Sequence, residues 1–178
     1  SIVNTMGKNK GGTIRSLAKK ANNTSGTLNA NSSHGYGGKV DVTGESVKIS
    51  NANITASGKL RGGKVRIGGE YLGGKLTNKD KNYKGFVTRF GDQPQLNNAK
   101  QTVVKADTNI DVSSQTGKGG TAVIWSDQFT EFDGQINAKG AEKILVSANL
   151  NERSKLGEST IDSPKTITTK IQTKIVSK

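Results

Sequence analysis

The chain has 178 residues, of which 30% are hydrophobic, 23 are glycine and none is cysteine, and its formal net charge is +13. Without cysteine, neither a disulfide scaffold nor a thiolate metal site is expected. No run approaches the roughly 18 apolar residues of a membrane-spanning helix, so we expect no membrane span. A chain this poor in hydrophobic residues and this rich in glycine fits a narrow coil better than a globule.

Two short motifs recur along the chain with nearly the same spacing. Glycine pairs open a strand at four places, the first three of them at almost equal intervals: Gly11-Gly12, Gly37-Gly38, Gly62-Gly63 and Gly119-Gly120. An apolar residue followed two positions later by Ala or Val recurs at the same interval, except that the middle interval is slightly more than doubled: Leu28-Ala30, Ile54-Ala56, Ile110-Val112 and Ile136-Ala138. A fixed period in the twenties is typical of a solenoid, in which only neighbouring turns bury each apolar face.

Within one period, three short alternating strands follow one another, at Val40–Val42, Val47–Ile49 and Ile54–Ala56. Alternation turns these apolar side chains inward and predicts that Asp41, Lys48 and Thr55 face outward. The pattern predicts a parallel β-helix over residues 1–160, with coils of about 20–26 residues. Helix signals are nearly absent, and the only fair segment for a helix is 14–21.

Residues 71–102 interrupt the period as an irregular insert. The separation of Ile54 from Ile110 is a few positions longer than two regular coils would require. The insert is polar and basic, and a loop of this length is either functional or an elaborated coil. One interpretation is a contact loop on the flank of the coil, with exposed aromatic residues beside its lysines. The other is an irregular strand over residues 85–90, whose aromatic side chains cover the coil interior.

Two runs of the chain resemble the repeat region of filamentous haemagglutinin-like exoproteins, the large passenger proteins of bacterial two-partner secretion systems. The runs are GGKVRIGGEYLG (62–73) and NNAKQTVVKADTNIDVSSQTGKGGTAVIWSDQFTEFDGQINAKG (97–140). The resemblance implies a right-handed parallel β-helix, export through an outer-membrane barrel transporter, and work as a secreted or cell-surface adhesin. The chain has nothing like the amino-terminal secretion domain of that family, so we expect it to be an interior piece of a longer secreted protein.

Positive charge concentrates in residues 59–105, with 11 Lys and Arg against 3 acidic residues. Such a bias favours polyanionic partners, here the anionic glycans of host or neighbouring cells, and predicts binding that weakens with salt. We expect the contacts on one outward strand face and on the insert, at Lys64, Arg66, Lys79, Lys81, Lys84 and Arg89. Nucleic acid is the poorer fit, because aromatic residues make up only 4% of the chain. The alternative is that these lysines only keep the coil soluble and protect its edges from pairing.

The sequence favours no catalytic residue, no cofactor and no metal, so we expect a protein that is not an enzyme. The only histidine, His34, lies in a glycine-rich turn and has no serine nucleophile motif to serve. A polysaccharide-cleaving β-helix enzyme remains a remote alternative because some acidic residues could cluster on one flank, namely Asp107, Asp111, Asp127 and Asp133. A structural stalk that presents another domain of a large exoprotein, including one of the contact-dependent inhibition type, is the closer alternative.

Four asparagines begin an Asn-x-Ser/Thr triplet and are candidate glycosylation sites: Asn22, Asn23, Asn31 and Asn53. Turn chemistry explains them about as well, because asparagine tolerates the left-handed corners that a coil requires. The tail, residues 161–178, alternates isoleucine with polar residues and contains no glycine. We expect it to form a strand that caps the last coil or begins the next one.

Overall fold

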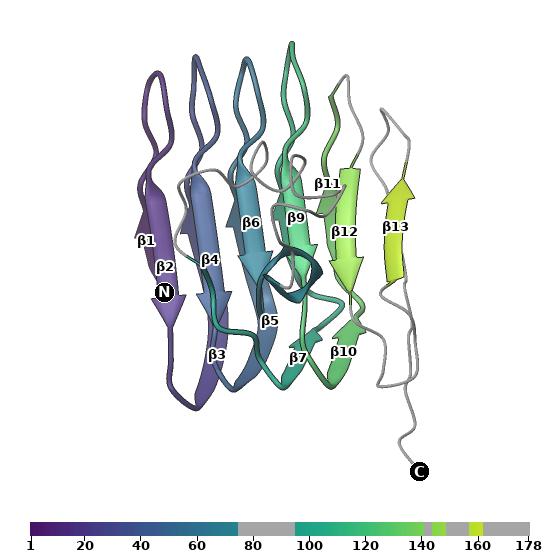
Figure 1. The fold of residues 1–178 in the computed structure, drawn as a ribbon. Helices are drawn as coiled ribbons and strands as arrows, with labels where there is room; N and C mark the ends of the chain where they lie inside the picture. The colour runs from purple at the N-terminus through teal and green to yellow at the C-terminus, as the bar shows by residue number, and fades with distance from the viewer. Residues whose placement is uncertain (75–94, 141–143, 149–156, 162–178) are drawn as a thin grey trace.

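The chain winds into a parallel β-solenoid of about four turns, which confirms the predicted fold class. A computed structural model describes residues 1–74, 95–140, 144–148 and 157–161. Successive turns stack side by side along the axis (Figure 1). The chain descends the front sheet and ascends the rear one while it advances from left to right in this view, which is the right-handed sense that the family resemblance implies.

Two parallel sheets form the walls of the coil. The front sheet has the strand order β2-β4-β6-β9, with bounds Thr13–Leu17, Lys39–Thr43, Lys64–Ile67 and Thr121–Ile124. The other sheet has seven strands, β1 (Ile2–Asn4), β3 (Ala21–Asn29), β5 (Ser46–Thr55), β7 (Gln101–Val104), β8 (Asn109–Asp111), β10 (Phe129–Phe132) and β11 (Gln135–Asn137). Because β3 and β5 are long and bent, each takes the place of two shorter strands in the later turns. β5 pairs with both β7 and β8.

The apolar positions of the period meet in rows that run through the interior. Leu28, Ile54, Ile110 and Ile136 are consecutive partners across β3, β5, β8 and β11, and none is more than 6% exposed. A second row joins the front strands through Ile14, Val40, Val65 and Ala122. These rows make a continuous aliphatic core, so each coil is stabilised mainly by its two neighbours.

The pairing of Ile54 with Ile110 corrects the interpretation of the insert. The stretch between them is a single coil with a long excursion, whereas the spacing of the motifs predicts two coils with a few extra residues. Regular pairing resumes at Gln101, the first residue of β7. Helix is nearly absent, as predicted: the one fair helical candidate, 14–21, contains most of β2, and the only helical element among the described residues is the 3-10 turn η1 (Tyr71–Gly74).

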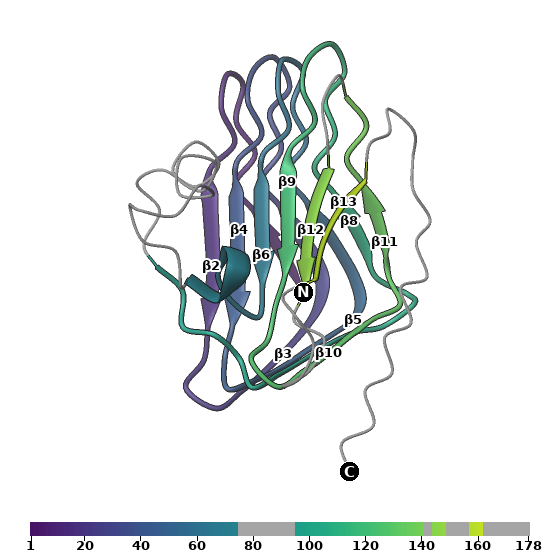
Figure 2. The ribbon, with the colours of Figure 1, turned by 45° about the vertical axis from the view of Figure 1, so that its right-hand side comes forward.

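Parallel stacking does not continue to the end of the described chain. β12 (Ile144–Ala148) and β13 (Gly157–Ile161) pair with each other in antiparallel fashion. β12 lies beside β9 in both ribbon views (Figures 1 and 2), at the end of the front sheet. Apart from Ile161, the predicted tail lies outside the described residues.

The inward row predicts which substitutions unfold the chain. Ile54→Asp should lower the free energy of unfolding by more than about 4 kcal/mol, because the side chain is fully buried and an unpaired carboxylate would replace it. Lys48→Asp, on the solvent side of the same strand, should change it by less than about 0.5 kcal/mol. Urea denaturation followed by circular dichroism measures both values. Equal tolerance at the two positions would contradict the inward assignment of Ile54.

Candidate polyanion-binding surface

The outer face of the front sheet is not a uniform solvated surface. A second buried layer covers it, formed by η1 and by the segment 95–98 that returns from the insert (Figure 2). Tyr71, Leu96, Val123 and Trp125 are at most 4% exposed there and stand apart from the aliphatic core. Side chains that point outward from β4 and β6 are therefore covered rather than solvated.

Arg66 lies at the centre of this outer layer and is fully buried. Its Nε and one terminal nitrogen donate to the two carboxylate oxygens of Asp41 at 2.8 Å each, and the other terminal nitrogen donates to Glu70 at 2.8 and 2.9 Å. Burial alone would lower the pKa of Arg66, but its hydrogen bonds and charge contacts with Asp41 and Glu70 outweigh burial and raise that pKa. Arg15 completes the group at 3.3 Å from Asp41.

The ion-pair network joins the solenoid wall to the insert. Beyond Arg66, the carboxylate of Glu70 accepts hydrogen bonds from the backbone nitrogens of Tyr71 and Leu96, at 3.2 and 3.1 Å. One acidic side chain thus ties together the residues that leave the coil and those that return to it. We infer that the network positions both ends of the insert against the front sheet.

Two residues predicted to face outward do point out of the coil but are buried, and one residue of the predicted binding set is inaccessible. Asp41 is 1% exposed because Arg66 and Arg15 hold it under the outer layer. Thr55 is 8% exposed and donates a hydrogen bond to Asn29 at 3.3 Å, in the preceding coil. Arg66 is inaccessible to a polyanion, because its charge is already bonded to two carboxylates.

The remaining predicted binding residues are placed as follows. Lys64 lies partly exposed at the start of β6. The other four, Lys79, Lys81, Lys84 and Arg89, lie outside the described residues, as does the predicted choice between a contact loop and an irregular strand over 85–90.

A different basic surface appears where the turns of the coil project beyond the two sheets. Four stacked loops protrude as narrow fingers at the top of Figure 1, and together they form a ridge that we call the fin: residues 7–11, 32–37, 58–62 and 114–119. The tips carry the row Lys8, His34, Lys59 and Thr116, here called the tip row. The returning arms carry a row of consecutive bridge partners, here called the flank row: Lys10, Tyr36, Arg61 and Lys118.

Backbone hydrogen bonds hold the fin rigid along its length. Along the flank row, the nitrogen of the glycine that follows each of the first three members donates to the carbonyl of the next member, at 2.9 Å in every case: Gly11 to Tyr36, Gly37 to Arg61 and Gly62 to Lys118. In the tip row, the nitrogens of His34 and Thr116 donate to the carbonyls of Lys8 and Lys59, at 2.8 and 2.9 Å. Neighbouring parallel strands lie about 4.8 Å apart, so the flank row, whose members are consecutive bridge partners, is a ladder with rungs at about that spacing.

Glycine makes the fin thin. A Cβ on Gly35 would lie 1.8 Å from the carbonyl oxygen of Asn9, and one on Gly117 would lie 1.8 Å from that of Leu60. Neither position can carry a side chain without moving the backbone of the loop beside it. The adjacent loops are therefore packed backbone against backbone, and their exposed side chains point into solvent.

The fin is basic and contains no acidic residue. The sequence of its loops and of the residues that flank them in the chain, 7–12, 31–39, 57–64 and 113–120, contains no Asp or Glu. The exposed cations are Lys8, Lys10, Lys59, Arg61 and Lys118. Arg61 and Lys118 are direct bridge partners, and like charges placed opposite each other repel, so an anion bound between them would be favoured.

The residue immediately before each glycine pair is the sequence signal for the flank row. These residues are Lys10, Tyr36, Arg61 and Lys118, but sequence reasoning used the glycine pairs only as markers of the period and missed them. His34 lies in a turn, as predicted, with its Nδ1 2.8 Å from the hydroxyl of Ser33.

The four acidic residues that could have formed a catalytic or metal site do not converge on one site, and all four lie in the described part of the chain. Within the part of the chain that the structure describes, no three His, Cys, Asp or Glu side chains lie close enough to hold a metal ion. Asp127 accepts hydrogen bonds from Asn98 and from the indole of Trp125, at 3.0 and 3.1 Å, and so belongs to the outer layer. Asp107 is exposed, and Asp111 and Asp133 are partly exposed on other segments.

One of the four candidate glycosylation sites is inaccessible. Asn22 is 7% exposed, and its amide nitrogen donates to the carbonyls of Ser16 and Thr43 at 2.8 and 3.0 Å. Because this nitrogen would have to carry the sugar, the prediction at Asn22 is wrong for the folded chain. Asn23 and Asn53 are exposed and Asn31 is partly exposed.

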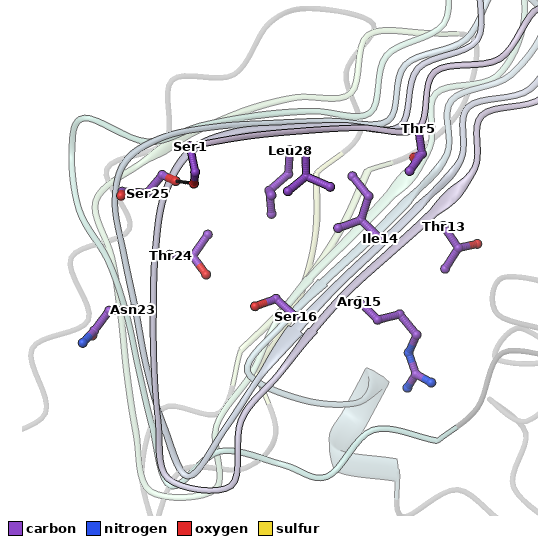
Figure 3. A pocket seen from close by; sticks show the side chains of 11 residues that line it. Ser1, Thr5, Thr13, Ile14, Arg15, Ser16, Asn23, Thr24, Ser25 and Leu28 are labelled. Atoms are coloured by element: carbon purple, nitrogen blue, oxygen red, sulfur yellow. Dashed lines mark hydrogen bonds between the residues drawn. The ribbon is translucent and has the colours of Figure 1, made fainter.

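A shallow hollow lies at the open end of the first coil (Figure 3). Leu28, Ile14, Thr24 and Ser16 point into the triangular interior of the coil, while Arg15 and Asn23 point away from it. The inward lining is aliphatic and hydroxylic. It is the end of the core and offers no group with an obvious reactive role.

Comparison with models of known protein families and with curated protein sequences finds no match to this chain. None of the helical structure in the described residues is long and apolar enough to cross a membrane.

The outer layer predicts that substituting Arg66 destabilises the fold much more than substituting Arg15. Arg66→Ala should lower the free energy of unfolding by about 3–5 kcal/mol, because it removes the one buried cation that pairs with both buried carboxylates, Asp41 and Glu70. Arg15→Ala should cost less than about 1 kcal/mol, because its side chain is 32% exposed and Asp41 keeps Arg66. Chemical denaturation of both variants measures the difference. An Arg66→Ala protein as stable as Arg15→Ala would rule out the network as the anchor of the insert.

Proposed function

We propose that this chain is a segment of a surface-exposed or secreted bacterial adhesin that binds host or neighbouring-cell surfaces through anionic glycans, with the fin as its contact surface. The observation that carries the proposal is the fin itself, a rigid, exposed ridge with five cations and no acid. Charge that serves only solubility is ordinarily mixed in sign and scattered. Here one sign is concentrated on one edge of the molecule, which attracts polyanions and speeds their encounter.

The resemblance to filamentous haemagglutinin-like exoproteins supports the setting. In that setting the parent protein leaves the cell through an outer-membrane barrel transporter and displays its β-helix at the cell surface. The solenoid then serves as the rigid support of the fin, since each loop is fixed by the coil below it.

Heparin binding at several salt concentrations tests the proposal. We expect weak to moderate affinity that declines steeply between about 0.05 and 0.3 M salt, where the screening length falls to roughly the spacing of the fin loops. The variant Lys10→Gln/Arg61→Gln/Lys118→Gln should lose about tenfold or more in affinity, because each exposed ionic contact contributes up to about 1 kcal/mol. Isothermal titration calorimetry measures both.

The matched control removes the same amount of charge elsewhere. Lys19, Lys20 and Lys48 are exposed and lie away from the fin, so Lys19→Gln/Lys20→Gln/Lys48→Gln should retain nearly all of the affinity. A third variant, Lys79→Gln/Lys81→Gln/Lys84→Gln/Arg89→Gln, tests whether the insert contributes. If the unaltered chain shows no salt-sensitive binding to any polyanion, the structural stalk becomes the better account.

A further inference from the structure

The flank row is a straight series of four side chains, one from each loop of the fin. Lys10 bridges Tyr36, Tyr36 bridges Arg61, and Arg61 bridges Lys118, although all four are far from one another along the chain. With about 4.8 Å between neighbours, the four rungs span about 14 Å parallel to the solenoid axis. A ligand that contacts all four must therefore be extended and must cross the loops rather than follow one of them.

The chemistry of the rungs restricts the ligand further. Three rungs are cationic, and the fourth, Tyr36, is 52% exposed and lies between Lys10 and Arg61. A tyrosine offers an apolar ring face together with a hydroxyl that can donate or accept a hydrogen bond. Rings of this kind suit the alternating apolar and hydroxyl-bearing surfaces of a sugar, while the neighbouring cations suit its sulfate or carboxylate groups.

Single-stranded nucleic acid fits this row less well. Such binding uses successive aromatic platforms on which consecutive bases stack. Of the four flank-row residues, only Tyr36 is a tyrosine, phenylalanine or tryptophan. The tip row contains none of these three residue types. The tip row instead adds Lys8 and Lys59 beside the flank row, which supplies a second line of charge for the same ligand.

We propose that the fin binds a linear acidic polysaccharide lying parallel to the solenoid axis, with one contact per loop along the flank row and with Tyr36 packed against a sugar ring. This proposal rests on the proposed glycan-binding function. It adds the orientation of the polysaccharide relative to the solenoid axis and the residues that contact it. Each loop provides one weak site, and the sites lie in one row, so a long polysaccharide can occupy several of them at once.

A length series tests the direction of binding. The probes are size-defined heparin oligosaccharides from disaccharide to decasaccharide, measured by calorimetry against the unaltered chain. Affinity should rise at least tenfold between disaccharide and hexasaccharide. It should then level off once the oligosaccharide is longer than the row of four rungs. If a disaccharide already binds as tightly as the longer oligosaccharides, the ligand occupies one local site and the axial arrangement is wrong.

Single substitutions test the rungs. Tyr36→Ala should weaken hexasaccharide binding about three- to tenfold with an unchanged salt dependence, whereas Arg61→Gln should weaken it and also reduce the salt dependence. Leu60→Ala is the matched control for Tyr36→Ala, because Leu60 is similarly exposed on the fin but outside the flank row, and it should leave affinity within twofold. A Tyr36→Ala variant that binds as well as Leu60→Ala overturns the role of the aromatic rung.

Single-stranded DNA of matched charge separates the two ligand classes. It should bind at least tenfold more weakly than the hexasaccharide at the same salt, and equal binding would overturn the choice of a polysaccharide. The failures are distinguishable: absence of heparin binding by the unaltered chain refutes the proposed function itself. Length-independent binding, or binding insensitive to Tyr36, refutes only the axial ladder.

Discussion

Each turn of the solenoid closes through a single carbonyl oxygen, and the recurring motifs of the chain surround it. The carbonyl of Ala56 accepts a hydrogen bond from the nitrogen of Gly63 at 2.6 Å, while a Cβ on Gly37 would lie only 2.0 Å from the same oxygen. The oxygen thus lies between Gly37, at the end of the preceding fin loop, and Gly63, directly after the fin loop that follows Ala56. Glycine pairs and Ile-x-Ala triplets share one period because they are two sides of this contact. A side chain at the contact would push neighbouring coils apart and weaken every inward row at once.

The same closure separates the core from the fin. On one side of this contact, the two sheets enclose the aliphatic core. On the other side, only the two arms of each fin loop continue, and backbone hydrogen bonds join each loop to the next. Polar and charged side chains in the fin therefore lose little solvation. Two unit charges at about 4.8 Å repel by only about 1 kcal/mol in water, which a well-packed coil tolerates. The architecture can accordingly hold like charges in a row and keep them available to a partner.

The regular part of the fold follows directly from the sequence, because inward alternation and the glycine period specify both the rows and their register. Ile54 and Ile136 lie in the row that their motif predicts. The covered outer face could not be predicted in this way. Alternation correctly turns Arg66 out of the coil, but whether that face meets water depends on η1 and on residues 95–98, which return to the front sheet only after the long insert. Spacing along the chain contains no information about where such an excursion folds back.

Charge in a solenoid has to be counted along columns of equivalent positions and not along windows of sequence. The window 59–105 contains a large excess of cations, yet it includes the buried Arg66 and omits Lys10 and Lys118. Lys10 and Lys118 lie near opposite ends of the repeat region in the chain but only three rungs apart in the flank row. The basic surface is therefore a property of the repeat itself, since the position before each glycine pair recurs once in every turn. A column of this kind lengthens with each added coil, which lets a repeat protein increase its affinity for a long polyanion by adding turns of the same fold.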